Sequence, residues 1–272
     1  MRYAFISDIH SNLQALEEGL ALIEKENVDE ICCLGDIVGY NANPCECLNI
    51  VRDHPKIRKI VVGNHDFNAY SDLHMSDWCS MSYDASVGIK YTRETLKDNQ
   101  KKYLKELPFE LVVPENEPLS FLMIHGSPLD PFDYVLNTID AKRAFDSLVK
   151  RNDAHICFHG HTHGTSFCRY YKSHVSFELG KKILKCSLNL GSKDGTVYFD
   201  LSKVENGAYY LINPGSIGQP RDGSRHSSYA IFDTDKKIVE IKFFGYNIQE
   251  AIDAILKAGY SKAIAKRLEK GK

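Results

Sequence analysis

The sequence predicts an α/β fold, a four-layer α/β/β/α sandwich in which two packed mixed sheets are flanked by helices. In the first half, short apolar runs alternate with amphipathic helical segments, a pattern typical of βαβ units and a parallel sheet. After residue 165, short strands separated by turn residues indicate antiparallel pairing. No internal repeat, low-complexity tract or linker divides the chain. We therefore expect residues 1–272 to form a single domain.

The first half of the chain alternates between expected strands and helices. In order, these are a strand at 2–7, a helix at 11–27, a strand at 29–36, a helix at 43–54 and a strand at 58–66. Ser11 or Asn12 is expected to cap the first helix, and Asn43 precedes Pro44 in the arrangement favoured at the start of the second. Parallel sheets bind ligands at the carboxyl ends of their strands, so functional residues are expected there.

The rest of the chain, from residue 67 onward, contains two expected insertions. Residues 67–108 are predicted to be mostly helical, clearest at 91–108, and residues 170–210 form a β-rich insertion. Thr138 is expected to cap the helix at 138–152. The expected strands of this part are 119–126, 154–164, 164–170, 174–179, 182–187, 195–200, 208–216, 227–234 and 237–246, and the chain closes with helices at 247–259 and 261–272.

Composition limits the class of protein. With 43% hydrophobic and 26% charged residues and a net charge of −2, the chain is typical of a globular protein and has no basic excess. A protein held to long nucleic acid through its phosphates is therefore not expected. No run of about 18 apolar residues is present, and the first strand begins at Tyr3, which leaves no room for a signal peptide. We expect a cytoplasmic protein with no membrane partner; its oligomeric state stays open.

The cysteines do not form a recognisable metal or redox motif. None of them is arranged as C-x-x-C, so a zinc ribbon or a dithiol motif is not expected. Scattered cysteines in a chain of this length are typical of buried thiols in a reducing compartment. The eight are Cys32, Cys33, Cys45, Cys47, Cys79, Cys157, Cys168 and Cys186.

Polar side chains follow the ends of five expected strands. They are Asp8 and His10, Asp36, Asn64 to Asp66, His125, and His161 with His163. Because residues i and i+2 of a strand project from the same face, we expect Asp8 and His10 to point together beyond the end of the first strand. Without His65 and Asp66, the set comprises two carboxylates, one amide oxygen and four imidazoles, a mixture suited to borderline divalent ions. Seven ligands are too many for one ion. Two ions sharing one carboxylate would leave positions open for water and substrate, as hydrolytic two-metal catalysis requires.

These residues carry a family resemblance. Between Asp8 and His163 the chain contains "SDIHSN", "GDIVGYN", "GNHD", "MIHGS" and "GHTH" in that order, and it resembles the calcineurin-like metallophosphoesterases. The later segment "LINPGSIGQPRDG" is similar to one in the small bacterial and archaeal phosphodiesterase branch of that family. The resemblance covers most of the chain.

The resemblance implies a role for each motif residue. For the first metal the implied ligands are Asp8, His10 and His163, for the second Asn64, His125 and His161, with Asp36 as the bridge. His65 would contact the phosphoryl oxygens or protonate the leaving oxygen, since an imidazole titrates near neutral pH. The implied ions are two divalent metals, Mn first, with Fe, Zn, Ni or Co as alternatives. The implied reaction is hydrolysis of a small phosphodiester, phosphomonoester or nucleotide by a metal-bridging hydroxide.

Some residues depart from the family pattern or have two interpretations. The protein Ser/Thr phosphatases carry Asp-Arg-Gly where this chain has "GDIVGYN", so that activity is disfavoured, and Ser11 stands where the family commonly has Gly. Asn12 and Arg221 are candidate substrate contacts, although Arg221 is equally compatible with an exposed side chain. An extended backbone would point His159 the same way as its two neighbouring motif histidines. We expect His159 to pack beside the ligands without binding a metal.

Two other functions are compatible with the same motifs. One is a catalytically silent metal-binding or protein-interaction module, but such modules tend to lose ligands or the histidine after the asparagine, and both are present here. The other is a nuclease acting on a long strand, which requires a basic groove that the sequence does not indicate. The sequence does not discriminate between a diester, a monoester and a nucleotide.

Overall fold

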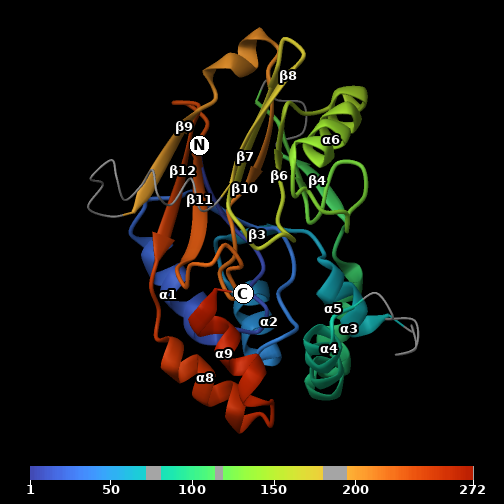
Figure 1. Cartoon of the computed structure of the whole chain (residues 1–272), viewed down its shortest axis with the longest axis vertical. Helices are drawn as coiled ribbons and strands as arrows, with labels where there is room; N and C mark the ends of the chain where they lie inside the picture. Colours follow the sequence, from blue (N-terminus) through green and yellow to red (C-terminus); the bar gives the residue numbers. More distant parts are fainter. Residues whose placement is uncertain (72–80, 114–118, 180–194, 272) are drawn as a thin grey trace.

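The structure, a computed structural model, describes residues 1–71, 81–113, 119–179 and 195–271. Two six-stranded sheets pack against each other in its upper part (Figure 1). The first sheet contains, in spatial order, β3 (Ile57–Ile60), β2 (Glu30–Cys33), β1 (Arg2–Ile6), β11 (Ser227–Asp233), β12 (Ile238–Phe244) and β9 (Thr196–Asp200). β1 pairs in parallel with β2, and β2 with β3, whereas β11, β12 and β9 pair antiparallel. The sheet is therefore mixed, as predicted.

The second sheet is also mixed. It contains, in spatial order, β4 (Glu110–Val113), β5 (Phe121–Ile124), β6 (Ile156–Phe158), β10 (Tyr209–Asn213), β7 (Ser166–Tyr171) and β8 (His174–Leu179). β5, β6 and β10 run parallel to one another, while β4, β7 and β8 pair antiparallel with their neighbours. Each sheet thus has a parallel part whose strands end at one edge.

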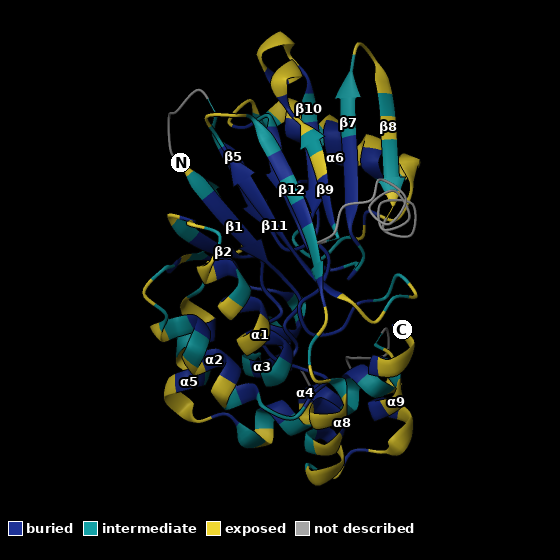
Figure 2. Cartoon of the chain, turned by 90° about the vertical axis from the view of Figure 1, so that its left-hand side faces the viewer, coloured by how far each residue is buried: buried dark blue, intermediate teal, exposed yellow. Residues whose placement is uncertain are grey.

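Helices cover the outer faces of both sheets. They are α1 (Leu13–Glu24), α2 (Pro44–Asp53), α3 (Asn64–Tyr70), α4 (Tyr83–Thr95), α5 (Asp98–Glu106), α6 (Thr138–Arg151), α8 (Ile248–Lys257) and α9 (Lys262–Lys270), with a 3₁₀ turn at Ser202–Asn206. α1 and α2 share an apolar core with the first sheet, and α6 shares one with the second. The predicted four-layer α/β/β/α arrangement is confirmed. α8 and α9 lie beside α4 at the lower end (Figure 2).

Aromatic packing between the two sheets fixes their relative position. The Phe5 ring of β1 stacks on the Phe158 ring of β6, with centroids 3.6 Å apart, and Phe121 of β5 meets both rings edge-on. All three side chains are fully buried, and Figure 2 shows the central strands as the most buried part of the chain. Burial of large aromatic rings stabilises such an interface strongly. The strands that precede the polar motifs are therefore held rigidly.

Three local expectations are corrected or refined. Asn137, and not Thr138, caps α6, because its side chain accepts hydrogen bonds from the backbone of Ile139 and Asp140. β4 was not predicted; it is a four-residue edge strand that depends on pairing with β5. β3 ends at Ile60, so the third motif begins a helix rather than completing a strand. The strand expected at 182–187 lies outside the described residues, as do two of the cysteines.

The expectations for the first helix cap and for most of the cysteines also hold. Asn12 is one of the two residues predicted to cap the first helix. It caps α1 by accepting a hydrogen bond from the Ala15 N–H. Of the six described cysteines, five are buried and Cys45 is partly buried. None of the helices in the described ranges combines the length and the apolarity that a membrane span needs.

Candidate metal centre

The motif residues follow strand ends but do not lie on extended backbone. β1 ends at Ile6, and the φ angles of Asp8 and His10 are 52° and 48°. Positive φ angles recur at Asp36 (52°), His161 (68°) and His163 (57°). The expectation that Asp8 and His10 project from one face of a strand is therefore wrong. Left-handed backbone is costly for residues other than glycine and is concentrated at functional sites.

Hydrogen bonds between three loops hold this backbone. The Asp8 N–H donates to the Gly35 carbonyl (3.1 Å) and the His10 N–H to the Asp36 carbonyl (2.9 Å), which joins the loops after β1 and β2. The His161 N–H, in the loop after β6, donates to both carboxylate oxygens of Asp8 at 3.2 Å. The two sheets thus contribute to one rigid centre.

One cluster of side chains comes from the loops after β1, β2 and β6. It contains Asp8, His10, Asp36 and His163, all buried, with potential ligand atoms within 4.8 Å of one another. His10 Nε2 lies 3.0 Å from His163 Nε2 and 3.5 Å from Asp36 Oδ2. His163 Nε2 lies 3.5 Å from Asp8 Oδ1. This geometry could hold a metal ion.

A second cluster adjoins the first through Asp36. It contains Asp36, His125 and His161, again buried and within 4.8 Å. His125 Nε2 lies 3.2 Å from Asp36 Oδ2 and 3.2 Å from Asn64 Oδ1. Asp36 Oδ2 therefore lies between the His125 imidazole and that of His10. The arrangement brings together all seven residues for which the sequence predicted ligation.

Backbone carbonyls orient three of the imidazoles. Nδ1 of each ring is hydrogen-bonded to a carbonyl oxygen: His10 to Val38 (3.1 Å), His125 to Leu34 (2.7 Å) and His163 to Gln219 (2.6 Å). A carbonyl only accepts, so Nδ1 carries the hydrogen and Nε2 faces the cluster. This is the supporting contact that metal-ligating histidines use to orient the ring.

The donor set fits a divalent cation. With both Nδ1 atoms protonated, neutral His10 and His163 direct two lone pairs at each other across 3.0 Å, which a shared cation would satisfy. Burial lowers the pKa of both rings well below the usual value and keeps them neutral. Burial opposes charge on Asp36, but the surrounding histidines outweigh it and lower its pKa. Its Oδ2 atom accepts no hydrogen bond of suitable geometry.

His65 stands apart from the ligand atoms. Its backbone N–H donates to Asp36 Oδ1 (2.8 Å), its ring lies 4.7 Å from that of His10, and its buried Nδ1 has no hydrogen-bond partner. Burial lowers the pKa of His65 to about 4. The ring borders a cavity of about 500 Å³. The cavity is lined by Tyr40, Asn64, His65, Asn68, Met81, Ser82, Ala85, Phe132, Tyr134, His161 and Arg221.

Two other polar residues, Asp66 and His159, lie near the centre but belong to neither cluster. The Asp66 carboxylate accepts hydrogen bonds from the N–H groups of Val38 (3.0 Å) and Gly63 (3.1 Å), which shapes the turn before α3. His159 is fully buried and belongs to neither cluster. Its backbone N–H donates to Ile212 O (3.0 Å), which continues the pairing of β6 with β10 past the end of β6. Neither of its ring nitrogens has a hydrogen-bond partner. The packed role expected for His159 stays a prediction.

The two candidate substrate contacts differ in their surroundings. Asn12 is 1% exposed, accepts from the Ala15 N–H and donates to the Gly218 carbonyl. These contacts engage both the oxygen and the nitrogen of the Asn12 amide within the protein itself. Arg221 lines the cavity and donates to Gln219 Oε1 (3.2 Å), while its buried Nε has no hydrogen-bond partner. Arg221 can therefore reach a bound anion.

Sequence reasoning missed two tyrosines. The Tyr40 ring lies 4.8 Å from the His10 ring and 4.7 Å from the His65 ring, on left-handed backbone with a φ of 53°. The Tyr134 ring stacks on His161 with centroids 3.8 Å apart. The position of Tyr40 within "GDIVGYN" was a signal that could have indicated it. Nothing local indicated Tyr134.

Fold and site together define the class, an α/β protein with buried clusters able to hold metal. The profile of the calcineurin-like phosphoesterase superfamily domain matches residues 1–237. The uncharacterized protein MJ0912 of Methanocaldococcus jannaschii is 34% identical over 273 residues, covering 99% of this chain and 98% of that protein. The chain therefore belongs to the calcineurin-like phosphoesterase superfamily, as the motifs predicted.

Two solved structures resemble this chain over its whole length. The crystal structure of a metallophosphoesterase from Sphaerobacter thermophilus matches with a TM-score of 0.79 and 31% identity, over 100% of this chain and 99% of that one. The hypothetical protein PH1004 from Pyrococcus horikoshii OT3 shares the fold, with a TM-score of 0.74 and 20% identity over 100% and 98% of the two chains. Membership of this family supports a hydrolase in general.

Proposed function

We propose that the protein is a dinuclear metal-dependent phosphoesterase that hydrolyses a small phosphodiester, phosphomonoester or nucleotide. The observation that carries this proposal is the position of Asp36, whose Oδ2 lies within 3.5 Å of His10 Nε2 and 3.2 Å of His125 Nε2. One carboxylate oxygen thereby serves two adjoining clusters. Mn is the first candidate for both sites, with Fe, Zn, Ni or Co as alternatives, because the donors mix imidazole with oxygen.

When bound, two such ions supply Lewis acidity toward the phosphoryl oxygens and an activated water for attack on phosphorus. Asp8, His10 and His163 would hold one ion, and Asn64, His125 and His161 the other. His65 and Arg221 line the adjoining cavity, where Arg221 would bind a phosphoryl oxygen. His65 would contact the phosphoryl group as a neutral ring or, where the negative charge of a bound phosphate raises its pKa from about 4, protonate the leaving oxygen. The volume of about 500 Å³ favours a small substrate over a long nucleic acid.

A hydrolysis panel tests the proposal. The Mn-loaded protein would be assayed with bis-nitrophenyl phosphate, nitrophenyl phosphate and diadenosine tetraphosphate, alongside elemental analysis. We expect two ions per chain and Mn-dependent hydrolysis of at least one substrate. Two bound ions without any hydrolysis would favour the catalytically silent module. Saturation at one ion would contradict the dinuclear site.

A further inference from the structure

Tyr40 lies against two arginines that are far apart in the sequence. The guanidinium carbon of Arg221 lies 5.3 Å from the Tyr40 ring centroid, and that of Arg267 lies 5.2 Å from it. Tyr40 is 4% exposed and its ring also adjoins His10 and His65. The guanidinium groups of Arg221 and Arg267 therefore both lie against the Tyr40 ring. That ring borders the metal centre on the side where His65 lies.

Arg267 comes from α9, which follows the residues matched by the family profile. Its Nη1 pairs with Asp84 Oδ2 of α4 at 3.1 Å. The end of α9 also reaches the Arg221 loop, because the Gly223 N–H donates to the Gly271 carbonyl (3.1 Å). The C-terminal helix thus contacts both the Tyr40 side and the Arg221 side of the cavity.

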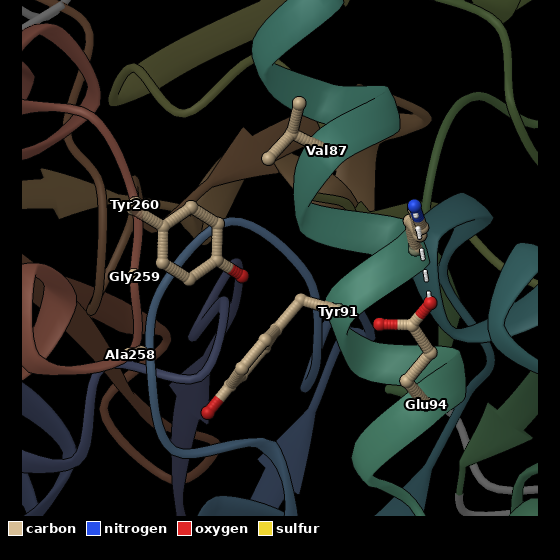
Figure 3. Close-up of a pocket in the computed structure, with 7 residues that line it drawn as sticks. Val87, Tyr91, Glu94, Ala258, Gly259 and Tyr260 are labelled. Atoms are coloured by element: carbon tan, nitrogen blue, oxygen red, sulfur yellow. Dashed lines mark ion pairs between the residues drawn. The ribbon is translucent and has the colours of Figure 1, made fainter.

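Two tyrosines attach the same C-terminal segment to the Tyr40 loop. The Tyr260 hydroxyl, from the segment between α8 and α9, donates to Asn41 O (3.4 Å), and the Tyr91 hydroxyl of α4 donates to Ala42 O (3.2 Å). Tyr91 and Tyr260 lie side by side (Figure 3), with ring centroids 5.1 Å apart. They line a small pocket of about 200 Å³ between α4 and this segment. That pocket contains none of the clustered ligands. The hydrogen bonds of Tyr91 and Tyr260 instead hold the backbone that directly follows Tyr40.

We propose that α9 completes the active site, with Arg267 acting as a positioning residue. Together with Arg221 it would form a cationic wall around Tyr40 that raises the affinity of the site for phosphate and favours a doubly charged phosphate group over a singly charged one. A fixed positive charge attracts a ligand in proportion to the ligand's charge, and the attraction is strong in a buried site. The identity of the ligand as phosphate rests on the proposed function.

The competing explanation is that Arg267 only anchors α9 through Asp84. The variants Arg267→Met and Asp84→Asn both break this ion pair, but only the first removes positive charge. If Arg267 acts through its charge, Arg267→Met weakens binding of inorganic phosphate by about 3- to 10-fold. Asp84→Asn then leaves the phosphate affinity unchanged or increases it, and Arg267→Lys restores most of the loss.

Phosphate affinity is measured by calorimetry on the Mn-loaded protein, which requires no turnover, with melting temperatures recorded for each variant. The preference for nitrophenyl phosphate over bis-nitrophenyl phosphate, as a ratio of kcat/KM, should fall in Arg267→Met, mainly through a higher KM for the monoester. Equal weakening of phosphate binding by Arg267→Met and Asp84→Asn, or no change in Arg267→Met, would overturn the inference. An enzyme that hydrolyses neither nitrophenyl ester nor diadenosine tetraphosphate, but shows the expected order of phosphate affinities, would contradict the proposed function and leave the cationic wall supported.

Discussion

Asp36 Oδ2 lies 3.2 Å from His125 Nε2, although the two residues follow strands of different sheets. Asp36 follows β2 of the first sheet, and His125 follows β5 of the second. The centre therefore depends on the packing between the sheets as well as on the loops that carry its side chains. A change at either residue should affect both clusters.

Replacing the shared carboxylate should remove most of the bound metal. In Asp36→Asn a neutral amide cannot balance the positive charge of two metal ions as a carboxylate does. Metal content and kcat/KM should therefore both fall sharply. Elemental analysis after reconstitution with Mn measures the first and hydrolysis of a nitrophenyl ester the second.

Asp66→Asn is a matched control, since it makes the same substitution at a second buried carboxylate. An amide cannot accept equally from both the Val38 and Gly63 N–H groups, so Asp66→Asn should lose about 1–3 kcal/mol of unfolding free energy but keep its metal. Equal metal loss in both variants would reject Asp36 as the bridge. His159→Ala should likewise retain metal, because His159 belongs to neither cluster.

Removing the His65 imidazole should separate catalysis from metal binding. His65→Ala should retain both ions and lose about 10²- to 10⁴-fold in kcat, the usual range for a positioned acid. The loss should be smaller for a nitrophenyl leaving group than for a nucleoside, because a phenolate needs little protonation. Loss of an ion would instead identify His65 as a ligand. Equal rate losses with both leaving groups would indicate that His65 stabilises the phosphoryl oxygens.

A methyl group at Gly39 should displace His65 without touching a ligand. A Cβ atom there would lie 2.4 Å from His65 Nδ1, at a backbone φ of 95°. Gly39→Ala should therefore lower kcat by about 10²-fold while the metal content stays normal.

Gly207→Ala controls for the backbone strain in this experiment. Gly207 has a φ of 79° and no atom within 4 Å of an added Cβ, so its substitution should cost roughly 1 kcal/mol of stability and leave the rate unchanged. Comparable rate losses in the two variants would show that strain, and not the position of His65, causes the effect.

Metal binding should release a proton from His125. Burial disfavours the charged imidazole, but the carboxylates of Asp36 and Asp8 outweigh it and raise the pKa of His125 to about 9. In the metal-free protein at pH 7 this ring is therefore protonated, whereas ligation requires the neutral form. Apparent affinity should rise with pH up to about 9. His10 and His163 are already neutral and should release none.

Calorimetric titration with Mn in two buffers of different ionisation enthalpy measures this release. We expect close to one proton per chain at pH 7 and much less above pH 9. A binding enthalpy that does not depend on the buffer at pH 7 would contradict the protonated state of His125.

The residues of the two clusters were predictable as candidates because each follows a short apolar run. The order of "SDIHSN", "GDIVGYN", "GNHD", "MIHGS" and "GHTH" specifies donor types, and the alternation of strands with helices places them at one sheet edge. The reason given for Asp8 and His10 was nevertheless wrong. Both residues lie beyond β1 on left-handed backbone, and the hydrogen bonds that hold them there come from the loop after β2.

The α/β class, most of the helices and strands and the chemistry of the donor set could be read from local patterns, because hydrophobic periodicity and residue type are local properties. Which side chains meet depends on the tertiary structure. It separated His159 from its neighbours, made Asp36 common to two clusters and brought Arg267 of the last helix against Tyr40. Contacts of this kind arise from the packing of two sheets and their helices, a long-range arrangement that no local pattern specifies.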